Sequence, residues 1–72
     1  MNYELLDALI LDCLMPGSRF LVRIMSGEVH VECDRIADAT WRESYRVLDA
    51  RLQALRKAGK IAFTSKAGWA VV

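Results

Sequence analysis

The sequence predicts an α+β fold that is mostly helical, with three to four helices and a small antiparallel β-sheet at the C-terminal end. Apolar residues recur at helical spacing in the segments 2–14 and 41–58. Gly59 follows the second segment, where a helix needs a left-handed residue in order to stop. Residues 61–72 then contain two short β-prone runs around a turn, which is the pattern of a β-hairpin.

The first predicted helix, Asn2 to Leu14, is apolar around most of its circumference. Helices of this kind are usually buried. A domain of this size, however, buries only about 60% of its unfolded surface. We therefore expect a homodimer that is sealed partly by this helix. The alternative is that Leu11 and Met15 are exposed or covered by the next segment.

Residues 18–33 allow two interpretations. Ser18 can cap a short helix that Gly27 ends, with its apolar residues on one face. Alternatively, the same residues form a strand that turns at Gly27 into a second strand. We expect the short helix, followed by a strand at Val29 to Val31 that pairs with the C-terminal hairpin.

The helix over 41–58 is expected to begin with a capping box of Thr40 and Glu43, in which each side chain satisfies a backbone N–H. Ser44 is an alternative N-cap, so the start can shift by one turn. The apolar stripe of this helix is formed by Tyr45, Leu48, Leu52 and Leu55.

A neighbouring arc of the same helix, about 100° wide on ideal geometry, is polar. It contains Arg42, Arg46, Asp49, Gln53, Arg56 and Lys57. Arginine and glutamine are side chains that reach phosphates and base edges in a major groove of DNA. The alternative is that this arc is only the solvated face of an amphipathic helix.

The predicted hairpin consists of Ile61 to Thr64 and Trp69 to Val72. Trp69 is expected to cover the apolar end of the preceding helix. Lys66 lies in the turn, where it can reach a phosphate or can be an ordinary surface lysine.

These residues resemble the winged helix-turn-helix superfamily. Asp34 to Ala39 looks like the second helix of that family, and Thr40 to Ser44 looks like its turn, with Trp41 as a buried plug. The segment Leu52 to Ile61 matches the pattern Leu-x-x-Leu-x-x-x-Gly-x-Ile, which ends the recognition helix and opens the wing. The resemblance covers Val29 to Val72. It implies a winged-helix fold that binds double-stranded DNA.

Charge is distributed unevenly along the chain, although the formal net charge is only +1. Residues 1–34 carry two basic and six acidic side chains, and residues 35–72 carry eight basic and three acidic ones. Such polarity favours an orientation with the basic side toward a polyanion.

Enzymatic and metal chemistry are not expected. Cys13 and Cys33 have neither metal-ligand spacing nor a CxxC redox motif. His30, the single histidine, is expected on the exposed face of a short strand without a nucleophile beside it. No glycine-rich phosphate loop is present, and we expect no cofactor and no small-molecule ligand. The first apolar run is interrupted by acids and is too short to span a membrane, so we expect a cytoplasmic protein.

One domain over residues 1–72 is therefore expected to act as a small transcriptional regulator that binds DNA as a dimer. Arg42 and Arg46 are the candidates for guanine edges, and Gln53 is the candidate for adenine or phosphate. Three further residues, Arg56, Lys57 and Lys66, are expected to contact the DNA backbone. Asp49 is expected either to select against certain bases or to orient an arginine. The alternative function is a winged-helix protein-interaction module.

Overall fold

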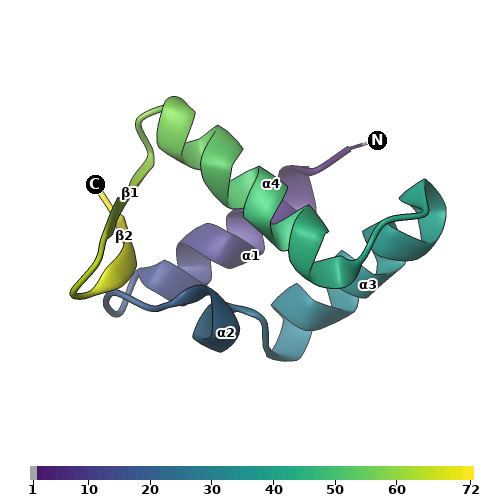
Figure 1. Ribbon diagram of the computed structural model, residues 1–72, viewed down its shortest axis with the longest axis horizontal. Helices are drawn as coiled ribbons and strands as arrows, with labels where there is room; N and C mark the ends of the chain where they lie inside the picture. Colours follow the sequence, from purple (N-terminus) through teal and green to yellow (C-terminus); the bar gives the residue numbers. More distant parts are fainter. Residues whose placement is uncertain (1) are drawn as a thin grey trace.

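The computed structural model describes residues 2–72. It contains the helices α1 (Glu4–Leu14), α2 (Leu21–Ile24), α3 (Gly27–Thr40) and α4 (Ser44–Lys57), and the strands β1 (Ile61–Thr64) and β2 (Gly68–Val71). The predicted α+β class with mainly helical content is thus confirmed. The molecule measures 32 × 22 × 19 Å, and the β-hairpin and the α3–α4 turn lie at opposite ends of its long axis (Figure 1).

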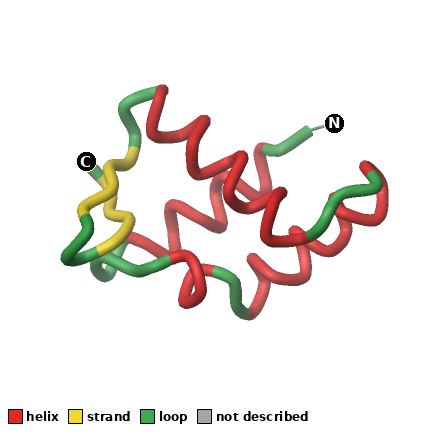
Figure 2. The backbone as a smooth tube through the Cα atoms, in the orientation of Figure 1, coloured by secondary structure: helices red, strands yellow, loops and turns green. Residues whose placement is uncertain are grey.

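The core forms where α1, α3, α4 and the hairpin meet. Each helix contributes residues at spacings of three or four, which is why one face of each is apolar. The largest fully buried side chains are Leu6, Ile10, Ile24, Cys33, Ile36, Leu48, Leu52 and Ile61. Figure 2 shows how the three long helices enclose this space, with the hairpin closing one end.

Gly59 ends α4 as predicted, with a φ of +78°. The Lys60 N–H donates to the Leu55 carbonyl and the Gly59 N–H donates to the Arg56 carbonyl, both at 3.0 Å. This pair of bonds is the Schellman motif, which satisfies carbonyls that the helix end leaves free. It also directs the chain straight into β1.

The two strands pair antiparallel, with Phe63 opposite Trp69 and their ring centroids 5.1 Å apart. Trp69 is only 5% exposed, so its predicted role as a core residue is confirmed. On its other side, β2 pairs with Arg19: the two residues exchange backbone hydrogen bonds of 2.9 and 2.7 Å. The segment between α1 and α2 is therefore joined to the edge of the hairpin.

The predicted strand at Val29 to Val31 is wrong, because these residues lie in α3. Gly27, which was expected to end the short helix, is instead the first residue of α3. The predicted second helix, Asp34 to Ala39, lies entirely within α3. The physical reason is that Val29, Cys33, Ile36 and Ala37 all become buried when the segment is helical. The backbone pairing with the hairpin, which was expected of a strand at Val29 to Val31, is made instead by Arg19.

The predicted capping box is also wrong. Thr40 is the last residue of α3, and its hydroxyl donates to the Ile36 carbonyl at 2.7 Å. Glu43 is the N-cap of α4 and makes no side-chain capping bond, so the helix begins at Ser44, one turn later than the expected start at residue 41. Trp41 is not a buried plug but is 97% exposed.

The expected burial patterns of two helices need correction. In α1, Leu6, Ile10 and Leu14 are buried, whereas Leu5 is 58% exposed. Within the single chain, Leu11 is half-buried and Met15 is exposed. In α4, Tyr45 is half exposed, and Val47 joins the leucines in the core. Over residues 2–72, no helix combines the length and apolar character that crossing a membrane requires.

Candidate nucleic-acid interface

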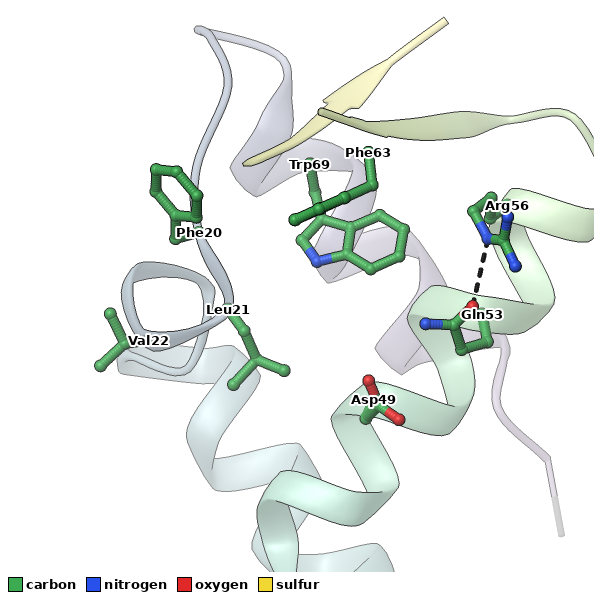
Figure 3. A pocket seen from close by; sticks show the side chains of 8 residues that line it. All are labelled: Phe20, Leu21, Val22, Asp49, Gln53, Arg56, Phe63 and Trp69. Atoms are coloured by element: carbon green, nitrogen blue, oxygen red, sulfur yellow. Dashed lines mark hydrogen bonds between the residues drawn. The ribbon is translucent and has the colours of Figure 1, made fainter. Parts of the chain in front are cut away.

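An open groove runs along α4, between this helix on one side and α2 and the hairpin on the other. It consists of two adjoining clefts of about 710 and 620 Å³, which share Leu21 and Asp49. Figure 3 shows the larger cleft, with the aromatic side chains of the hairpin facing α2 and the polar side chains of α4.

Five of the seven residues predicted from the sequence line this groove. Arg42 and Arg46 border the smaller cleft, Gln53 and Arg56 border the larger one, and Asp49 lies between them. The spacing explains the arrangement, since residues three, four and seven apart lie on one side of a helix. The N-terminal position of Arg42, just before α4, continues the same line.

The remaining two predicted residues lie outside the groove. Lys57 is exposed in the last turn of α4 and lines neither cleft. Lys66 is exposed in the turn between β1 and β2, at the end of the molecule that holds the hairpin. Neither residue borders the space beside α4.

The cations of the groove are not neutralised within the chain. In the part of the chain that the structure describes, the arginines that form salt bridges are Arg35 and Arg51. Arg46 lies over the Tyr45 ring at 5.7 Å, and the Arg56 Nε donates to the Gln53 Oε1 at 3.1 Å. Neither contact removes positive charge, so the guanidinium groups remain available to an anion.

Arg51 belongs to the same helix but has a different role. Its guanidinium group donates two hydrogen bonds, of 2.9 and 2.8 Å, to the Asp7 carboxylate and lies 4.5 Å from the centre of the Tyr3 ring. The hydrogen bonds from Arg51 to Asp7 raise the pKa of Arg51. Arg51 thus joins α4 to α1 and lines neither cleft of the groove.

The sequence did not indicate the apolar residues of the groove. Phe20 and Phe63 are about half exposed and Val22 is mostly exposed, and all three line the larger cleft (Figure 3). Phe63 pairs with Trp69 across the hairpin, but Trp69 is buried whereas Phe63 stays about half exposed. The position of Phe20 depends on the pairing of Arg19 with β2, for which the sequence carries no local signal.

Nucleophilic and metal-binding groups are dispersed. Cys33 is buried, and burial, with smaller contributions from Asp34 and Glu32, raises the pKa of its thiol to about 11. His30 lies exposed on α3, not on a strand as expected, and its Nε2 is 3.5 Å from the Asp34 carboxylate. Among residues 2–72, no three His, Cys, Asp or Glu side chains come together as metal ligands.

Comparison of the chain with models of protein families, with curated proteins and with solved structures gives no match.

Proposed function

We propose that this chain is a winged-helix DNA-binding protein that reads the major groove with α4 and contacts the backbone with its hairpin. The observation that carries the proposal is the alignment of Arg42, Arg46, Gln53 and Arg56 along one open groove, with no intramolecular ion pair to any of them among residues 2–72. Unpaired arginines on one face of a helix are suited to guanine edges and phosphates.

The order of elements supports the winged-helix part of the proposal. A helix α1, the short pairing at Arg19, a helical pair α3–α4 and the hairpin follow one another in the chain. In this arrangement α4 is the recognition helix, and Lys66 lies in the wing turn, where it reaches a phosphate. The short helix α2 is an addition between the pairing at Arg19 and the helical pair α3–α4.

Asp49 gives the groove its selectivity. Its carboxylate is exposed between the two clefts and accepts no hydrogen bond from the side chains of residues 2–72. Facing phosphate it would be repulsive, but in the major groove a carboxylate accepts from the N4 amino group of cytosine. Asp49 therefore selects cytosine and rejects bases that present an acceptor at the same place.

The test is selection from a pool of random duplex DNA at two salt concentrations, followed by affinity measurement on the enriched sequence. Arg46→Ala is expected to weaken that site by about 1–3 kcal/mol. Arg23→Ala removes the same charge from an exposed position that lines neither cleft, and it is expected to change affinity by less than about 0.5 kcal/mol. Equal effects of the two substitutions would reject α4 as the reading helix.

A second candidate function is a protein-interaction module, which the exposed side chains of Phe20, Val22 and Phe63 favour. Apolar and aromatic side chains of this kind form the centre of protein interfaces. Salt distinguishes the two functions. The DNA affinity of a protein that neutralises Z phosphates falls with a log–log slope of about −0.9Z, whereas an apolar interface responds weakly.

The proposed regulator acts as a homodimer through α1 and the adjoining side of α3. A cleft of about 350 Å³ lies between these helices and is lined by Leu5, Leu9, Glu28, Val31 and Glu32. Leu5 and Val31 are 58% and 70% exposed, so a second copy would remove apolar surface from water. This face shares no residue with the groove beside α4, so dimerisation and DNA binding are compatible.

A further inference from the structure

Trp41 combines two unfavourable features. It is the single non-glycine residue of the described part, 2–72, with a positive φ, at +59°, and its side chain is 97% exposed. The left-handed backbone region is strained for a residue with a Cβ atom. An indole ring is also among the largest apolar groups that a protein can leave in water. A residue with both features is a candidate for a contact with a partner.

The turn around Trp41 is anchored on both sides. The N–H groups of Trp41 and Arg42 both donate to the Ala37 carbonyl at the end of α3. Beyond the turn, the Ser44 hydroxyl donates to the Asp34 carboxylate, which joins the start of α4 to α3. The indole ring is therefore attached to a hydrogen-bonded turn. This turn between α3 and α4 lies at the end of the molecule opposite the hairpin (Figure 1).

Aromatic rings and arginines alternate in the residues that follow. Tyr45 is half exposed, with the Arg46 guanidinium over its ring, and both side chains border the 620 Å³ cleft together with Arg42. The carboxylates on the elements around these residues are Asp34 and Asp38 on α3, Glu43 in the turn and Asp49 at the edge of the cleft, and the one with a printed contact here, Asp34, accepts from the Ser44 hydroxyl. The two arginines have no ion-pair partner among residues 2–72, so they remain available to phosphates.

We propose that the rings of Trp41 and Tyr45 form a stacking site for an unpaired nucleobase, at the N-terminal end of the face of α4 whose Arg42 and Arg46 bind duplex DNA. Exposed aromatic rings stack on the faces of bases regardless of their identity, and adjacent arginines bind the backbone of the same strand. The proposal rests on the proposed function for its duplex part. It adds that the protein prefers a duplex that carries an unpaired base to one that is fully paired.

A nucleic acid fits this surface better than a protein does. The centre of a protein interface is apolar and depleted of charge. The immediate neighbours of Trp41 are instead Thr40 and Arg42, followed by Glu43. Exposed aromatic rings beside arginines without an ion-pair partner among residues 2–72 match the strand-binding surfaces of single-stranded nucleic acid proteins.

The experiment compares two DNA probes of identical mixed sequence, one a blunt duplex and one with a short single-stranded extension. Affinities are measured at low salt for the wild type, Trp41→Ala and Trp41→Phe. The wild type is expected to bind the extended duplex at least about five-fold more tightly. Trp41→Ala is expected to remove this preference while leaving the affinity for the blunt duplex unchanged, and Trp41→Phe is expected to keep part of the preference.

A second readout uses the tryptophans themselves. Trp41 is exposed and Trp69 is 5% exposed, so acrylamide quenches mainly the emission of Trp41. The extended duplex is expected to protect this emission from acrylamide, whereas the blunt duplex leaves it accessible. The Trp41→Phe variant identifies which part of the signal belongs to Trp41.

The outcomes separate the two proposals. Equal affinity for both probes, with Trp41 still accessible, would overturn the stacking site and leave the duplex function intact. Binding of the extension alone, lost in Trp41→Ala, would support the stacking site and reject duplex recognition by α4. Binding of neither probe would overturn both proposals and direct the search to a protein partner.

Discussion

Trp41 occupies a position where glycine or asparagine is the usual residue, because it follows the last turn of α3 with a left-handed backbone. A Cβ atom in this region costs about 1–2 kcal/mol, and asparagine tolerates it better than other residues. Trp41→Asn is therefore expected to raise the free energy of unfolding by about 0.5–1 kcal/mol. Urea denaturation followed by far-UV circular dichroism measures this change.

Trp41→Ala is the matched control for this prediction. Alanine keeps the Cβ atom in the left-handed region and removes only the exposed ring. Its free energy of unfolding is expected within about 0.5 kcal/mol of the wild type, as for most surface substitutions. If alanine and asparagine stabilised the protein equally, backbone strain at residue 41 would not be the cause.

The ion pair of Glu32 with Arg35 is expected to make the folding stability of the protein depend on pH in the acidic range. Its carboxylate is 7% exposed and accepts two hydrogen bonds from Arg35, of 2.8 and 2.6 Å. Those hydrogen bonds lower the pKa of Glu32 below its ordinary value of 4.5, against the opposing effect of burial. The unfolded chain thus binds the proton more readily, so the stabilisation is present above pH 4.5 and is lost as the pH falls through the folded pKa.

Thermal unfolding between about pH 6 and pH 3 tests this linkage. The wild type is expected to lose more stability on acidification than Glu32→Gln, because glutamine cannot titrate. Other carboxylates titrate equally in both proteins, so the difference between the two curves isolates Glu32. Parallel curves would show that Arg35 does not hold this carboxylate in its charged form.

At the scale of elements, the hairpin depends on Gly68. This residue has a φ of +84°, and a Cβ atom added there would lie 2.5 Å from the Arg19 carbonyl oxygen. Gly68→Ala must therefore displace the backbone that exchanges two hydrogen bonds between Arg19 and Trp69. We expect a loss of about 2 kcal/mol or more from strain and broken hydrogen bonds together.

Gly59→Ala provides the comparison for Gly68→Ala. Gly59 also has a positive φ, but a Cβ atom there meets nothing within 4 Å. Only backbone strain remains, so we expect a loss of about 1 kcal/mol. Chemical denaturation of both variants measures the difference, and near-UV circular dichroism of Trp69 reports whether the hairpin detaches. Equal losses would mean that the contact with Arg19 does not hold the hairpin.

The elements that could be predicted from the sequence are those with local signals. Gly59 and the alternating runs after it predicted the end of α4 and the hairpin correctly. Val29 and Val31 led to the wrong prediction of a strand, because β-branched residues favour strands when only the local sequence is considered. In the folded chain, the helix α3 buries Val29 against the core. Trp41 was missed for a related reason: burial is the default expectation for tryptophan, and only the tertiary structure shows the ring outside.

The candidate site was predictable to the extent that it lies on a single helix. The spacing of Arg46, Asp49, Gln53 and Arg56 was sufficient to place them on one side of α4, and Arg42, just before the helix, continues the same line. The opposite wall of the groove comes from α2 and the hairpin, which approach α4 only through long-range packing. Phe20 and Phe63 could therefore not be assigned from local spacing.

At the scale of the whole molecule, a second copy of the chain can meet the α1–α3 face with complementary charge. Glu28, Val31 and Arg35 lie on one exposed side of α3, at spacings of three and four. If two α3 helices pack antiparallel about a two-fold axis near Val31, each Glu28 faces the other copy's Arg35. An isologous interface of this kind is self-complementary in both its apolar and its charged parts.

The dimer is tested by light scattering and by the dependence of the melting temperature on concentration. We expect a dimeric mass, and a melting temperature that rises with protein concentration because association stabilises the folded state. Val31→Asp is expected to give a monomer, since it buries an unpaired charge in the apolar centre of the interface. Val72→Asp, at an equally exposed position outside this face, is expected to remain dimeric. A monomeric wild type at all concentrations would reject the α1–α3 dimer.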